Sequence, residues 1–352
     1  MQPPEQPQTR IQRAFSPLPL ELFLQVLDQL VGTRDGRQQI AYAPSDPATN
    51  ALRALALTSR SIYPLASRYL YAHCLYLQNC INYARFRRTL GLSLGYHPEA
   101  LPYGEAGRNE QLFCEADISR HITSLFVSPQ KTEQCGNAPM VRLPQIIDLF
   151  TSIGPTLKRL AIDLQPVYTP GSEIRLVKPH IASNNIFLGM PKLEELVCSF
   201  DVSDYFPYPP PNLKRLAMTF QDIDDSHLTF CFSISSLEML FFLRPEGLDA
   251  KDINELFSRY KGRHLDIGLV AVNANHRTPK YSRTWTEDDR VTIWEVDVPT
   301  SYYGDEDEMI LCDGWIWSHG VQGTLWGQAK RRMTCWREIE RRLASDHVSE
   351  QA

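Results

Sequence analysis

The sequence contains no long apolar run and no excess of positive charge. No stretch reaches the roughly 18 consecutive apolar residues that a membrane-spanning helix requires. The net charge of -5 argues against a general role in binding nucleic acids or anionic membranes, because both attract basic surfaces. Apolar residues make up 43% of the 352 residues and charged residues 22%, which is ordinary for a globular protein of two or three packed units.

Several motifs of catalysis and metal binding are also missing. The sequence has no HExxH motif, no P-loop and no catalytic-cysteine signature. Its eight cysteines include no CxxC pair, which argues against a zinc site and a disulfide framework and favours reduced thiols in the cytosol or nucleus. We therefore expect no enzyme, no cofactor and no metal. An unrecognised enzyme stays an alternative, because a fold can bring distant residues together.

The first helix expected along the chain has an unusually wide apolar surface. Residues 16–30 contain a proline near the start, and a glycine follows the segment, as is common at helix ends. The polar residues Glu21, Gln25, Asp28 and Gln29 share an arc of roughly 100°, so apolar side chains fill about two-thirds of the circumference. One core needs only a stripe of about 100°. This pattern indicates either two separate contacts or a helix enclosed within one larger core.

Three motifs near the amino end, taken in order, resemble a known family. They are Leu18-Pro19-x-Glu21 with the helix that follows it, Leu55-Ala56-Leu57-Thr58-Ser59-Arg60-Ser61, and Tyr69-Leu70-Tyr71. Together they resemble the F-box, in the form common in filamentous fungi, over residues 15–77. Two features depart from the family: the insert between the first two helices is longer than usual, and Ile62-Tyr63 stands where a tryptophan is frequent.

The resemblance implies a fold, a partner and a function. In that family a three-helix F-box binds the small Skp adaptor, which connects it to a cullin–RING ubiquitin ligase. The chain would then be a substrate-recognition adaptor of an SCF-type ligase, with its remaining residues binding the protein target. A protein-binding module that acts outside ubiquitination is the alternative. The residues implied to form or support the docking face are Leu18, Pro19, Leu22, Val26, Leu27, Leu30, Leu55 and Leu57.

Residues 78–272 contain a repeated pattern, apolar-x-x-Leu-x-apolar. Its successive central leucines lie 20 to 36 residues apart, with helix-like stretches such as 143–153 and 249–260 between copies. Short strands alternating with helices at such spacings resemble an irregular leucine-rich-repeat solenoid, in which stacked neighbours bury what one strand cannot. A doubly wound α/β domain with coincidental leucine spacing is the alternative. The central residues are Leu125, Leu160, Leu196, Leu216 and Leu240.

The expected strand register also predicts a surface. Lys158, Glu194, Lys214 and Glu238 each follow the first leucine of a copy, so they should occupy equivalent exposed positions with alternating charge. This alternation favours a protein partner of mixed charge over a polyanion. The alternative is that these four residues serve solubility alone.

The two ends of the chain differ from the middle in composition. Residues 1–14 are rich in proline and glutamine and predict a disordered tail. All six tryptophans lie within residues 273–352, an aromatic-rich unit that we expect to close the end of the solenoid or to serve as a recognition surface. Residues 328–343 predict an amphipathic helix, and the acidic run 305–308 predicts a solvated loop. The predicted class is thus α/β: a three-helix F-box, an irregular leucine-rich-repeat-like solenoid and an aromatic-rich unit.

Overall fold

The structure is a computed structural model, and some of the predictions fall outside the residues that it describes. These excluded predictions are the tail 1–14, Leu18, the acidic run 305–308 and most of the expected helices 249–260 and 328–343. The described residues are 19–32, 38–92, 118–131, 140–167, 185–219, 223–243, 259–270, 289–296, 315, 317–328 and 330–332.

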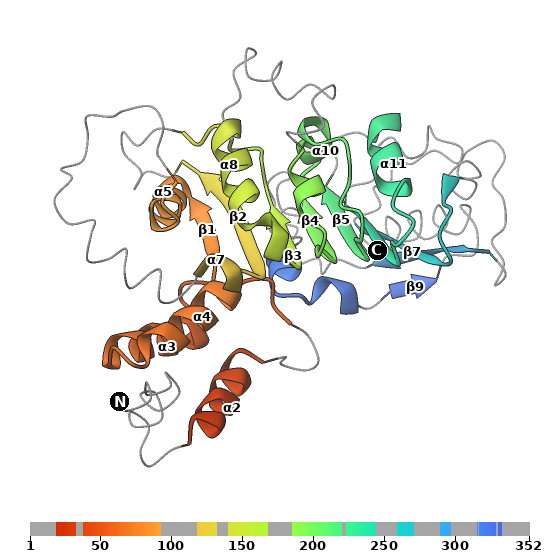
Figure 1. Cartoon of the computed structure of the whole chain (residues 1–352). Helices are drawn as coiled ribbons and strands as arrows, with labels where there is room; N and C mark the ends of the chain where they lie inside the picture. Colours follow the sequence, from red (N-terminus) through yellow and green to blue (C-terminus); the bar gives the residue numbers. More distant parts are fainter. Residues whose placement is uncertain are drawn as a thin grey trace, which may run out of the picture.

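Three helices at the amino end form a small unit of their own (Figure 1). They are α2 (Leu20–Val31), α3 (Pro47–Thr58) and α4 (Tyr63–His73). The Asp46 side chain caps α3 by accepting a 2.8 Å hydrogen bond from the Ala48 N–H, and the next residue is the proline favoured in a first helical turn. The core between the helices contains Phe23, Leu27, Val31, Tyr42, Ala48, Leu52 and Leu65.

A single sheet holds the rest of the described chain together. Its strands are hydrogen-bonded in their order along the sequence, the first eight in parallel and the ninth antiparallel to the eighth. The expected α/β class is confirmed at this level. The order never reverses, whereas a doubly wound sheet has a switch point. The strands are β1 (Tyr76–Asn79), β2 (Ser124–Gln130), β3 (Arg159–Ile162), β4 (Glu195–Cys198), β5 (Arg215–Thr219), β6 (Met239–Leu243), β7 (Leu265–Val270), β8 (Val291–Val296) and β9 (Lys330–Arg332).

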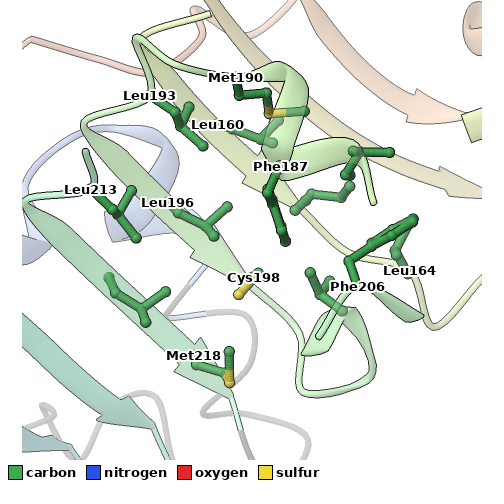
Figure 2. Packing of buried hydrophobic residues seen from close by; sticks show 14 of the residues in the cluster. Leu160, Leu164, Phe187, Met190, Leu193, Leu196, Cys198, Phe206, Leu213 and Met218 are labelled. Atoms are coloured by element: carbon green, nitrogen blue, oxygen red, sulfur yellow. The ribbon is translucent and has the colours of Figure 1, made fainter. Parts of the chain in front are cut away.

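The repeated leucines are aligned across the sheet. In each pair of neighbouring strands from β2 to β6, the central leucine of one is the register partner of the central leucine of the next, and all five are fully buried. Their side chains and those two residues later point to one face, while the residue between them points to the other. Figure 2 shows Leu160, Leu196 and Met218 reaching from adjacent strands toward Phe187 and Phe206.

Helices cover the leucine face of the sheet (Figure 1). α8 is typical: its buried residues recur three or four positions apart, as a helix with one covered face requires, and Pro144 lies in its first turn. The helical segments are α5 (Cys80–Thr89), α7 (Ile118–His121), α8 (Leu143–Ile153), η3 (Gly154–Thr156), η5 (Ile186–Gly189), α10 (Asp201–Tyr205) and α11 (Asp225–Phe232).

The opposite face of the sheet is covered by the chain's own carboxyl-terminal segment, the described residues between 315 and 332. In Figure 1 this segment, coloured blue, runs beneath the strands. The Ile40 N–H donates a 2.7 Å hydrogen bond to the Val321 carbonyl. Gly323 has a φ of 68°, and a Cβ there would lie 2.3 Å from the Gln38 carbonyl oxygen. The apolar residues joined on this face are Ile40, Ala41, Phe126, Ala161, Val197, Ala217, Phe241, Leu243, Val270, Val296, Trp315, Val321 and Leu325.

One expectation about the carboxyl-terminal segment requires correction. Residues 330–332, inside the expected helix 328–343, form β9, because β8 offers an unpaired edge and because Lys330 is held by Asp266 at 3.3 Å and lies over the Trp294 ring. Of the tryptophans that the structure describes, Trp315, Trp317 and Trp326 pack on the second face of the sheet, whereas Trp294 lies on β8 near the end of the sheet. The helical period of the apolar residues therefore predicted the wrong conformation for residues 330–332.

Candidate protein-binding surfaces

The helical unit exposes apolar side chains at several of the expected docking positions. Leu22 and Val26 lie one turn apart on α2 and are 46% and 56% exposed, and Pro19, which precedes the helix, is also exposed. Leu57, near the end of α3, is 88% exposed. We call Leu22 and Val26 the apolar stripe of α2. Exposed large apolar side chains one turn apart on a helix are candidates for a protein-binding surface.

The other expected docking residues have different environments. Leu27 is fully buried, because Phe23, Leu27 and Val31 recur every four residues and face the core of the helical unit. Leu27 is therefore placed to support the exposed side chains from behind, and not to contact a partner directly. Leu30 and Leu55 are half-buried against the same core.

The helical unit is joined to the sheet through α4. The Tyr42 N–H donates to the His73 carbonyl oxygen at 2.8 Å, and the Ser124 hydroxyl donates to the Ala72 carbonyl oxygen at 2.7 Å. Burial, assisted by the positive charge of Arg159, lowers the pKa of His73 to about 4. His73 is therefore neutral near pH 7, so the junction does not titrate through this histidine in the physiological range.

A buried polar group fixes the carboxyl-terminal segment to the sheet. The Trp326 Nε1–H donates to Glu195 Oε1 at 2.7 Å, and Arg215 Nη1 lies 3.5 Å from Glu195 Oε2. Beside them, Arg159 Nη1 donates to the Gln39 carbonyl oxygen at 2.7 Å. Burial raises the pKa of Glu195, while Trp326, Arg159 and Arg215 act in the opposite direction. The sequence motifs gave no indication of this group, because its members are 131 residues apart in the chain.

A second polar cluster lies at the carboxyl ends of the strands. The Ser128 hydroxyl donates to Asp163 Oδ2 at 2.8 Å, and the Ser199 hydroxyl donates to Asp201 while accepting from the Leu164 N–H. Burial raises the pKa of both carboxyl groups, to about 6 for Asp201, where the charge of Asp163 adds to the effect. The described residues include no group of three or more His, Cys, Asp or Glu side chains that could hold a metal. The local bonds make this cluster a structural one.

The raised pKa of Asp201 predicts a measurable pH dependence of stability. A carboxyl group whose pKa is higher in the folded than in the unfolded state favours folding at low pH, and this contribution is lost as pH rises through the folded pKa. We expect Asp201→Asn, relative to wild type, to gain roughly 1–3 kcal/mol of unfolding free energy between pH 4 and 7.5. Urea unfolding at several pH values measures this, with the exposed Glu21→Gln as the matched control. A pH-independent difference between Asp201→Asn and wild type would contradict the prediction.

One sequence pattern that is shared with hydrolases occurs in an unsuitable context. Residues 91–95 read Gly-Leu-Ser-Leu-Gly, which matches the GxSxG pattern. In α/β-hydrolases that pattern forms a sharp turn from a strand into a helix. Here Gly91, with a φ of 72°, follows the end of helix α5, and residues 93–95 are outside the described part of the chain. The pattern therefore gives no support to a nucleophile elbow.

The four register-equivalent charged residues lie where the sequence predicted them. The N–H of Glu194 donates to the carbonyl oxygen of Lys158, that of Lys214 to Glu194, and that of Glu238 to Lys214, at 2.8–2.9 Å. All four side chains are exposed, and Lys214 Nζ lies 3.3 Å from Glu194 Oε1. They belong to the amino edge of the sheet, which we define as the turns 155–158, 191–194, 211–214, 235–238, 261–264 and 289–290 leading into β3–β8.

Comparisons with known proteins add no identification. Neither models of known families, nor curated proteins, nor solved structures match this chain. Within the described residues, no helix combines the length and apolarity needed to cross a bilayer. Two surfaces of the molecule bear on its function: the apolar stripe of α2 and the amino edge of the sheet.

Proposed function

We propose that this protein is a substrate-recognition adaptor of an SCF-type cullin–RING ubiquitin ligase. One observation carries the proposal: the three-helix unit leaves Leu22, Val26 and Leu57 exposed at positions that resemble the F-box docking motif. Placing these side chains in an interface would remove apolar surface from water, at roughly 25 cal/mol per Å². In this proposal the helical unit is an F-box, and the stripe contacts the Skp adaptor.

The sheet supports a role in recognising the target. Eight parallel strands in sequential order, with buried leucines aligned from β2 to β6, favour an irregular leucine-rich-repeat-like solenoid. In the proposal the solenoid binds the protein to be ubiquitinated, and the chain itself performs no catalysis. Its place of action would be the cytosol or nucleus, in keeping with Cys74, Cys198 and Cys231, which form no disulfide.

Co-expression with the Skp adaptor of the same organism tests the proposal. We expect the two chains to co-elute in size-exclusion chromatography as a 1:1 complex, and addition of the cullin–RING scaffold to give a larger complex. A folded chain that elutes apart from the adaptor at micromolar concentration would overturn the proposal. The alternative function would then be favoured: a binding module that uses the amino edge of the sheet and acts outside ubiquitination.

A further inference from the structure

The surface through which the sheet can bind a partner is restricted by the fold. The leucine face is covered by helices, and the opposite face is covered by the carboxyl-terminal segment together with residues 38–42. Trp315 and Leu325 in that segment are almost completely buried, so the segment belongs to the core. Among the described parts of the sheet region, the amino edge is a continuous row that crosses six strands and remains open to solvent.

The amino edge carries more cations than carboxylates, in contrast to the chain as a whole. Its acidic residues are the exposed Glu194 and Glu238 and the half-buried Asp289, and its exposed cations outnumber them. The whole chain, in contrast, has a net charge of -5. Such a concentration of one sign creates a local potential that attracts the opposite charge. The exposed cations of the edge are Lys158, Lys192, Lys214, Lys261, Arg263 and Arg290.

Hydrogen bonds between successive turns hold the edge in place. The Asn212 side chain donates to the Pro191 carbonyl oxygen at 2.8 Å, and the Ser236 hydroxyl donates to the Leu213 carbonyl oxygen at 2.8 Å. Tyr260, just before the next turn, donates from its hydroxyl to the carbonyl oxygens of Leu237 and His264. The turns that carry the cations are therefore held at the strand spacing of about 4.8 Å. A partner that binds there loses little free energy in ordering the backbone of these turns.

We propose that the amino edge binds an acidic segment of a protein partner in extended conformation. From β3 to β8 the edge spans five strand spacings, about 24 Å, which an extended peptide of roughly seven residues covers. Glu194 and Glu238 stand within the row, and Glu194 pairs with Lys214. A polyphosphate would place a negative charge against each of them, whereas a peptide can present an amide or a basic side chain there. This inference rests on the proposed function, because it names the kind of target that the adaptor recognises.

Selection from a random library of displayed 12-residue peptides tests the inference. We expect the peptides captured by the wild-type protein to be enriched in Asp and Glu. Reversing three edge cations together, Lys192→Glu, Lys261→Glu and Arg263→Glu, should weaken their binding about ten- to a hundredfold, measured by fluorescence anisotropy at low salt. The matched control reverses three exposed cations elsewhere, Arg85→Glu, Arg88→Glu and Lys131→Glu, and should change affinity less than about twofold.

Three results would overturn the inference. They are captured peptides without acidic enrichment, equal losses in the edge and control variants, and tighter binding of a 12-nucleotide single-stranded DNA than of the selected peptides. Circular dichroism of both variants verifies that they are folded. Co-elution with the Skp adaptor is measured on the same proteins. Peptide binding without adaptor binding would leave the edge as a recognition surface and remove the ligase function, and adaptor binding without peptide binding would do the reverse.

Discussion

Replacing both Leu22 and Val26 by aspartate is expected to abolish binding of the Skp adaptor while the protein stays folded. Both side chains are about half exposed, so aspartate at these sites remains solvated in the unbound protein. In the complex each carboxylate would be transferred from water into an apolar interface, at a cost of several kcal/mol. We expect affinity to fall by a factor on the order of a thousand or more. Isothermal titration calorimetry with the purified adaptor measures this loss.

The same helix provides a matched control and a contrasting variant. Gln25→Asp with Gln29→Asp adds the same charge at exposed polar positions, and we expect it to leave adaptor affinity within about threefold of wild type. Leu27→Asp would place a carboxylate in the helical core and should unfold the unit, so its loss of binding would not report on the interface. Unchanged affinity of the folded Leu22→Asp, Val26→Asp variant would show that α2 is not the docking helix.

Strands β2–β6 were predictable from sequence because their information is local. Each copy of the pattern places a leucine such as Leu160 or Leu196 in a short apolar run, and period-two alternation fixes which side chains face the helices. Register followed from the same pattern. Lys158 and Glu194 were therefore correctly expected to be equivalent and exposed.

The burial of the helix α2 residues was only partly predictable. The helical periodicity of residues 16–30 separated polar from apolar positions. It could not distinguish the apolar residues that face the core of the helical unit from those that face outward. Leu22 and Leu27 have the same chemistry, and α3 and α4 decide that one is exposed and the other buried. Tertiary contacts of this kind are not contained in local periodicity.

The covering of the second sheet face could not be predicted from local patterns. The strand residues that point to this second face are small or aromatic, such as Ala161, Ala217 and Phe241. A face open to solvent would also tolerate such residues. The segment that covers them lies far along the chain, as the 131 residues between Trp326 and Glu195 show. β9 was missed for the same reason, since its strand conformation depends on the open edge of β8 and on the ion pair between Lys330 and Asp266.

Trp326→Ala is expected to have a large effect on stability, because Trp326 joins the carboxyl-terminal segment to the sheet. Its ring contacts Phe241, with centroids 5.3 Å apart, and its Nε1–H donates to the buried Glu195. Truncation removes an aromatic contact and leaves a buried carboxylate without one of its donors. We expect the unfolding free energy to fall by about 3–5 kcal/mol. Urea unfolding followed by circular dichroism measures this without depending on tryptophan fluorescence.

Trp326→Phe separates packing from hydrogen bonding and has its own pH dependence. It keeps an aromatic ring against Phe241 but removes the donor to Glu195, so we expect a loss of about 1–3 kcal/mol near pH 7. Burial already raises the pKa of Glu195, and loss of the donor should raise it further. A folded pKa above the unfolded value favours folding at low pH and loses that contribution as pH rises. The deficit of Trp326→Phe relative to wild type should therefore grow between pH 4.5 and 8. If both variants remained within about 0.5 kcal/mol of wild type at every pH, the carboxyl-terminal segment would not be part of the core, and the second face of the sheet would be open to a partner.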